Sequence, residues 1–221
     1  MWPKHQKAMN YINEIQLLSQ YGNVPITANV LNKLLCSYKA PKMKIQAMVR
    51  NGSIIRIKKD LYVVSPEISR KPLSPELIAN HLYAPSYVSL HYALNYYGII
   101  PERVATVMSA TTMHTQTFQT PIGRFTFNNF ADDYFPIGVT MATEGDISYM
   151  IASPEKALCD MLMVEHHVPS QSLSALEVFF EEDMRIELED LKAMDRNIIK
   201  QCMERGKKKK VLAHLLKLME R

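Results

Sequence analysis

The chain has 221 residues, of which 47% are hydrophobic and 22% are charged, close to the average of soluble globular proteins. This composition excludes global disorder, and no run approaches the roughly 18 apolar residues of a membrane helix. No apolar stretch of the kind found in a signal peptide follows the first residues, so we expect a folded, soluble, cytoplasmic protein.

The basic residues are concentrated at one end of the chain. Residues 1–65 hold ten Lys and Arg against two acidic side chains, a net charge of +8. The remaining residues, 66–221, hold 16 basic and 20 acidic side chains, a net charge of −4. Solvation alone does not require one sign of charge, whereas binding a polyanion does, because each phosphate that is neutralised releases condensed counterions. The asymmetry therefore favours a nucleic-acid-binding N-terminal part.

Three helices are predicted in this basic part. Apolar residues at helical spacing predict the first over residues 3–19, ending near Gly22. Thr27 is typical of an N-cap and predicts a short second helix after it. Pro41 opens a third over residues 41–51, with Ile45, Met48 and Val49 facing inward.

A hairpin follows the third helix. Residues 54–57 and 61–64 are rich in β-branched and aromatic side chains, and Lys58-Lys59-Asp60 joins them. Three short helices followed by a basic hairpin form the order of a winged helix-turn-helix, with residues 53–64 as the wing. We therefore predict a winged helix-turn-helix DNA-binding domain over residues 1–65.

Three prolines between residues 66 and 75 predict a linker over residues 66–74, followed by a second domain over residues 75–221. The linker precedes a mixed pattern of predicted elements: helices at 76–83, 90–97 and from Pro154, strands at 87–89, 104–108, 117–120, 124–128 and 147–152, and tail helices at 171–180, 187–203 and 208–220. Strands 104–128 are expected to form a small antiparallel unit. The predicted fold class is α+β: the winged helix-turn-helix, then a small mixed α/β domain with a helical C-terminal tail.

Three local patterns resemble the AbiEi antitoxins of bacterial abortive-infection toxin–antitoxin systems. Residues 48–57, closing on Leu61-Tyr62, are similar to the wing signature of that family. The other two blocks are at residues 87–101 and 152–160. Many members have Gly before Leu-Tyr where this chain has Asp60, which tolerates positive φ better than most residues, so the turn is expected to survive.

The resemblance implies a transcriptional repressor of its own operon, which binds double-stranded DNA at its promoter and is not an enzyme. It also implies functional pairing with an AbiEii-type nucleotidyltransferase toxin, without a stable complex between the two. No cofactor or metal is expected.

The third predicted helix would enter the major groove. With its apolar residues inward, Met43, Gln46, Ala47 and Arg50 lie on the opposite face. Gln46 can pair with adenine and Arg50 with guanine, while Met43 and Ala47 can contact thymine methyl groups. Further basic side chains are expected on phosphates: Lys39, Lys42 and Lys44 near the helix, and Arg56, Lys58 and Lys59 on the wing.

Two other classes of function stay open. A metal-dependent nuclease would need converging carboxylates, for which the candidates are Asp132, Asp133, Glu144, Asp146 and Glu155. Glu155 begins a predicted helix, where an acidic residue is expected for dipole reasons alone, with Lys156 as its solvent-facing neighbour. The other alternative is an interaction protein that holds a toxin through its C-terminal helices.

Two smaller patterns favour no specific function. Lys207–Lys210 form a second basic run, which is typical of a solvated helix face. Cys36, Cys159 and Cys202 are too widely spaced for a zinc site, and we expect reduced, buried thiols.

Overall fold

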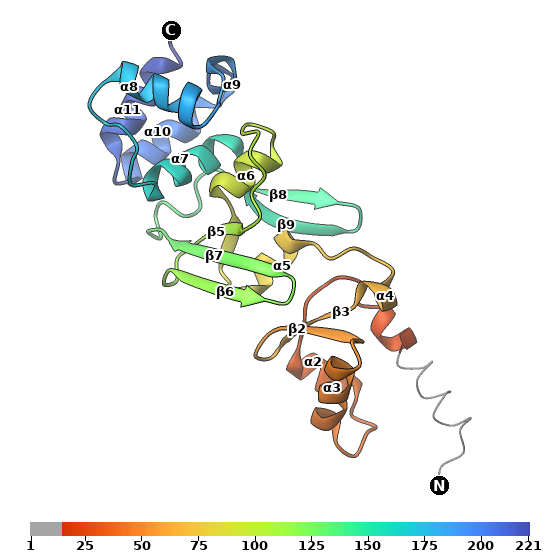
Figure 1. Ribbon diagram of the computed structural model, residues 1–221. Coiled ribbons are helices and arrows are strands. Elements are labelled where there is room, and N and C mark those ends of the chain that lie inside the picture. The colour runs from red at the N-terminus through yellow and green to blue at the C-terminus, as the bar shows by residue number, and fades with distance from the viewer. Residues whose placement is uncertain (1–14) are drawn as a thin grey trace. The chain divides into compact units, whose positions relative to one another are not determined.

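The computed structural model describes residues 15–221 (Figure 1). The predicted first helix therefore lies largely outside the described residues, but residues 15–19 are helical. Contacts divide the chain into two units. Unit 1 runs to Leu82 and includes residues 120–122, and unit 2 comprises Tyr83–Gln119 and Gly123–Arg221. The division follows Leu82, so residues 66–82 join unit 1.

Unit 1 contains a helix pair followed by a hairpin. Its elements are β1 (Ile26–Thr27), α2 (Ala28–Leu34), α3 (Pro41–Arg50), β2 (Ile54–Lys58), β3 (Leu61–Val64), α4 (Pro66–Ser69) and α5 (Pro75–Leu82). The strands form a sheet of order β1-β3-β2, with antiparallel pairing throughout. The predicted second and third helices and the hairpin are confirmed, whereas the predicted linker contains α4.

Local capping explains these boundaries. The Thr27 hydroxyl accepts a hydrogen bond from the Val30 amide at 3.4 Å, as an N-cap does at the start of α2. Asp60 has φ 63°, a left-handed conformation that favours glycine but that aspartate tolerates better than most residues. The pairing register shifts between Arg56 and Lys58, which places a bulge just before this turn.

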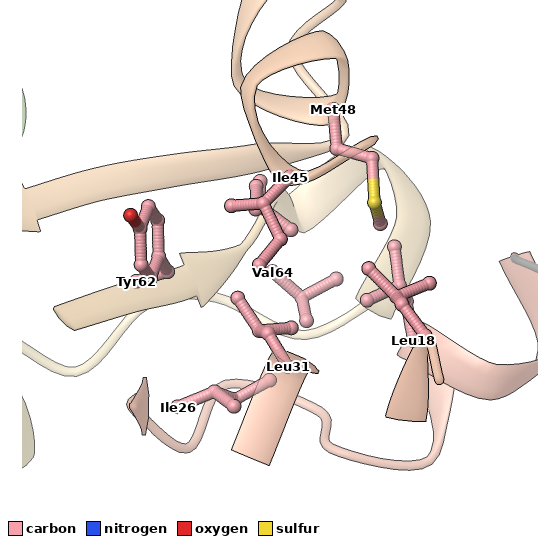
Figure 2. Packing of buried hydrophobic residues seen from close by; sticks show 9 residues of the cluster. Leu18, Ile26, Leu31, Ile45, Met48, Tyr62 and Val64 are labelled. Carbon is pink, nitrogen blue, oxygen red and sulfur yellow. The ribbon is translucent and has the colours of Figure 1, made fainter. Parts of the chain in front are cut away.

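The core of unit 1 is centred on a cluster of buried hydrophobic side chains. Figure 2 shows side chains from the helical segment at residues 15–19, from α2, from α3 and from the sheet converging on one another: Leu18, Ile26, Leu31, Ile45, Met48, Tyr62 and Val64. Leu31 is completely buried, and Val49 packs against the cluster from its edge. The inward face predicted for α3 is therefore confirmed, because burying this face stabilises a helix too short to persist alone.

Unit 2 is built around a six-stranded mixed sheet. The strands are β4 (Ser86–Val88), β5 (Val107–Thr111), β6 (Gln116–Thr120), β7 (Gly123–Asn129), β8 (Val139–Glu144) and β9 (Ile147–Ala152), in the order β6-β7-β5-β4-β9-β8. The predicted antiparallel unit is wrong for its first strand, because β5 and β7 run parallel, whereas β6 and β7 are neighbours joined by a tight turn as expected. The chain reverses direction once between β5 and β6 and again between β6 and β7, so β7 runs in the same direction as β5. Strand β8 was not predicted, because its side chains lack a buried alternation.

Helices occupy much of the rest of unit 2, and the fold as a whole is mixed α+β. They are α6 (Leu90–Tyr96), α7 (Pro154–Val164), α8 (Leu173–Val178), the π-helix η1 (Phe179–Asp183), α9 (Leu188–Ala193), α10 (Arg196–Arg205) and α11 (Lys209–Leu218). The single helix predicted over residues 187–203 is divided, because Asp195 caps α10 by accepting from the Asn197 amide at 2.7 Å.

The helices and the cysteines can both be compared with what the composition predicts. Within residues 15–221, none of the helices has the length and apolar character that crossing a bilayer requires. Cys159 and Cys202 are buried as expected, but Cys36 is exposed, because it lies in the loop after α2 rather than on the packed face of that helix.

Candidate nucleic-acid interface

Helix α3 is held firmly at both ends. Pro41 lies in its first turn, where a missing amide proton costs nothing. At the other end Gly52 takes φ 77°, and the Ser53 amide donates to the Met48 carbonyl at 2.9 Å. The Asn51 side chain also accepts from the Ser53 amide, at 3.1 Å. The chain is thereby turned directly from α3 into β2, which positions the helix relative to the hairpin.

The outer face of α3 is open to solvent, as the sequence predicted. Gln46 and Arg50 are exposed, and Ala47 is half-buried. Met43 is 59% exposed, which leaves its thioether and methyl group accessible to another molecule. A helix face that combines an amide, a guanidinium and a thioether can hydrogen-bond to base edges and contact thymine methyl groups.

The lysines around α3 fall into two groups. Lys39 and Lys42 are exposed. Lys44 is half-buried, with its ammonium 5.2 Å from the centre of the Tyr38 ring. Such a cation–π contact restrains the side chain while leaving its charge in place. All three remain candidates for phosphate contacts, with Lys44 the most restrained.

The three basic residues predicted for the hairpin differ in their exposure to solvent. Arg56 and Lys59 are exposed, and the Arg56 Nε donates to the Lys58 carbonyl at 3.4 Å. Lys58 is half-buried, and its ammonium donates to the carbonyl of Leu82 at the end of α5. Lys58 therefore has a structural contact within unit 1 that the sequence did not predict.

The charge of this region is almost entirely of one sign. Residues 15–65 contain eight Lys and Arg and a single acidic residue, Asp60. Within the part of the chain that the structure describes, Lys42, Arg50 and Lys59 form no ion pair with a carboxylate. Exposed and uncompensated, these charges produce a positive potential that attracts polyanions.

Unit 2 contains a different polar group, a buried ion pair in the first turns of α7. Lys156 and Asp160 are both fully buried and lie 2.9 Å apart. The prediction that Lys156 faces solvent is wrong. Its ammonium lies 3.3 Å from the centre of the Tyr134 ring and donates to the Tyr134 carbonyl at 3.2 Å, so aromatic and carbonyl groups replace water.

Two hydroxyl groups donate hydrogen bonds to the Asp160 carboxylate. Asp160 Oδ2 accepts from Ser89 Oγ at 2.7 Å and from Tyr87 Oη at 3.0 Å. Burial, followed by the nearby Asp160 charge, raises the pKa of Tyr87 well above its ordinary value, so its hydroxyl keeps its proton and remains a donor. Tyr87 and Ser89 come from the second resemblance block, and Lys156 and Asp160 from the third. The structure therefore joins these two blocks through one buried network.

The thiols beside this network behave as buried groups. A hydrogen bond to Cys202 and burial raise the pKa of Cys159 well above its ordinary value. The same hydrogen bond lowers the pKa of Cys202. Lys156, Asp160 and Cys159 are fully buried, so this cluster has the character of a structural core.

The carboxylates considered for a nuclease are engaged separately. Asp133 lies 3.6 Å from Arg205, Glu144 accepts from Tyr149 Oη at 2.5 Å, and Glu155 accepts from the Asp195 amide at 3.0 Å. Asp132 and Asp146 are exposed. Among residues 15–221, no group of three or more His, Cys, Asp or Glu side chains could hold a metal ion. The candidate carboxylates therefore do not form the shared site that this alternative requires.

The second basic run, Lys207–Lys210, spans the loop between α10 and α11 and the first residues of α11. Lys207, Lys209 and Lys210 are exposed, while Lys208 donates to the Glu165 carbonyl. Partial burial lowers the pKa of Lys208. Arg205 and Lys207 also line a cavity of about 190 Å³ beside Phe130 and Tyr134.

Comparison with known proteins adds no identification. No family model matches the chain, and no curated protein matches it.

Proposed function

We propose that unit 1 is a winged helix-turn-helix that binds double-stranded DNA, with α3 as its recognition helix and the β2–β3 hairpin as its wing. The order helix, strand, helix, helix, hairpin supports this assignment, as does the pairing of β1 with β3 at the side of the sheet opposite β2. The observation that carries the proposal is the exposed face of α3, where Met43, Gln46 and Arg50 lie opposite the buried Ile45 and Met48.

Base reading and phosphate binding are assigned to different side chains. Gln46 and Arg50 have the donors that recognise adenine and guanine in the major groove, with Met43 beside them. Lys39, Lys42, Arg56 and Lys59 are exposed cations on the same unit and would bind phosphates, which positions the protein without reading sequence. The contacts of Lys44 and Lys58 within unit 1 make them weaker contributors.

The biological role follows from the resemblance to AbiEi antitoxins. On that basis the protein is a repressor that occupies its own promoter, excludes polymerase and antagonises an AbiEii-type toxin without forming a stable complex with it. The joining of the second and third resemblance blocks in the Lys156–Asp160 network supports reading those blocks as parts of one domain.

A footprint on the DNA upstream of the protein's own gene tests this function. We expect protection of a discrete segment by the full chain at physiological salt. The double variant Gln46→Ala/Arg50→Ala should lose sequence preference, at a cost of about 1–3 kcal/mol for each specific contact, and keep its affinity for nonspecific DNA. Equal protection of all sequences by the unaltered protein would contradict a sequence-reading role.

A further inference from the structure

Strand β8 (Val139–Glu144) ends the six-stranded sheet of unit 2 with one side of its backbone open. Among the described residues it pairs with β9 alone, in six consecutive antiparallel pairs. Every second residue of an antiparallel edge strand directs its amide and carbonyl groups away from its partner. An edge of this length is a template for another strand, and proteins usually protect one with charge, proline or a covering segment.

Strand β8 carries only one of these protections, the charge of Glu144 at its last position beside the turn. Its sequence from Val139 to Thr143 contains no charged residue and no proline. Gly145, with φ 62°, forms the tight turn to β9, so the strand continues regularly to the end of the hairpin. The edge is therefore long and regular, and it is uncharged over its first five residues.

A pair of exposed methionines adjoins this edge. Met141 and Met150 are directly opposite each other on β8 and β9, and are 63% and 40% exposed. On the same face, Thr143 and Ser148 join through a hydrogen bond of 2.9 Å between their hydroxyl groups. Methionine is flexible and polarizable, and adapts readily to a second apolar surface.

The opposite edge of the same sheet offers a natural comparison. Strand β6 (Gln116–Thr120) is also uncharged, but its exposed side chains are Gln116, Thr117 and Gln119, while Phe118 packs on Tyr83 and Phe127. Pairing at β6 would cover polar side chains that water already satisfies. Of the two edges of this sheet, β8 is the one that carries exposed methionines beside its open backbone.

We propose that β8 pairs antiparallel with β8 of a second copy of this chain, joining the two six-stranded sheets across a two-fold axis. Such an interface is self-complementary, because the same strand meets itself. With no charge from Val139 to Thr143, no like charges face each other across the axis. Pairing centred near Met141 brings both copies of Met141 and Met150 together on one face, where they cover one another.

The size of the interface sets its strength. One pair of short strands and four methionines forms a small contact, so we expect a reversible dimer that dissociates on dilution rather than a permanent one. This inference does not rest on DNA binding, although a dimer would supply the two reading units that paired half-sites require.

Sedimentation velocity of the full chain without DNA, over a concentration series from about 1 to about 200 μM, tests the dimer. The unaltered protein should shift from monomer toward dimer. Met141→Lys should weaken dimerisation at least tenfold, because two ammonium groups then meet near the axis. Thr117→Lys, which adds the same charge to the β6 edge, should leave the equilibrium unchanged.

Three results would overturn the proposal. They are a monomer at every concentration, a dimer that survives Met141→Lys, and equal weakening by both variants. Since Met141 is mostly exposed, both variants should melt at the same temperature as the unaltered protein, and this comparison shows whether the altered chain is folded. Anisotropy measurements on DNA separate failure of the dimer from failure of DNA binding.

Discussion

The two units place their charges in opposite ways. Unit 1 has an apolar core and carries nearly all its basic residues on the surface, whereas unit 2 encloses a lysine and an aspartate completely. An exposed charge costs little to fold and remains available to a partner. A buried pair contributes to the fold only while every group around it is satisfied. The charges of unit 1 are therefore available for the proposed DNA binding, whereas those of Lys156 and Asp160 are enclosed in the fold.

The largest effect should come from breaking the buried pair of unit 2. Lys156→Met leaves the buried Asp160 without its cation, and we expect a loss of about 3–5 kcal/mol in the free energy of unfolding. Urea unfolding measures this loss. The double variant Lys156→Met/Asp160→Asn keeps an acceptor for Ser89 and Tyr87 and should recover much of it. If the single variant were as stable as the unaltered protein, the pair would not be structural.

The corresponding change in unit 1 removes apolar volume instead of charge. Leu31→Ala empties space in a fully packed core and should cost about 2–5 kcal/mol. It should lower the temperature at which DNA binding is lost, without changing affinity at low temperature. Met43→Ala, on the exposed face of α3, is the control and should leave the melting temperature unchanged.

A smaller effect should separate two neighbouring lysines on the hairpin. Lys59→Ala should weaken binding to all DNA sequences and reduce the magnitude of the salt slope by about 0.9, because one exposed phosphate contact is lost. Lys58→Ala should change the slope less, since that ammonium already donates to the Leu82 carbonyl. Fluorescence anisotropy over a salt series measures both. Equal effects would show that Lys58 exchanges its internal contact for a phosphate.

The smallest effect should be a pH dependence in unit 2. Burial lowers the pKa of His91 below its ordinary value of 6.5, so the unfolded chain takes up a proton more readily than the folded one. This site has no effect on stability well above its ordinary pKa, and stability is lost as the pH falls below that value of 6.5. His91→Gln should flatten that decline in thermal melts. An unaltered slope would show that other groups control it.

Local rules predicted unit 1 well. A threonine N-cap, a proline in the first turn of α3 and an aspartate that accepts positive φ each act within a few residues, so they are visible in the sequence. The exposure of Gln46 and Arg50 also followed from helical spacing alone. The contact of Lys58 with Leu82 did not, because it joins residues 24 apart.

Unit 2 was predicted less well because its structure depends on distant pairings. Strand β7 lies between β6 and β5, and no local signal specifies that order. Lys156 was expected in solvent because lysine is almost never fully buried without a partner. Asp160 four residues later, together with nearby tyrosines, was the signal that could have indicated a buried pair, but it identifies the site only once Tyr134 and Ser89 are known to be adjacent.

The central claim, that the one-signed charge of unit 1 binds DNA through phosphates, is tested most directly by the salt dependence of affinity. Anisotropy with a duplex from the upstream region of the gene, measured between about 50 and about 200 mM salt, should give a log–log slope of about −3 to −5 for the full chain. This range corresponds to the exposed cations of the α3 and hairpin surface. A slope near zero would contradict the account.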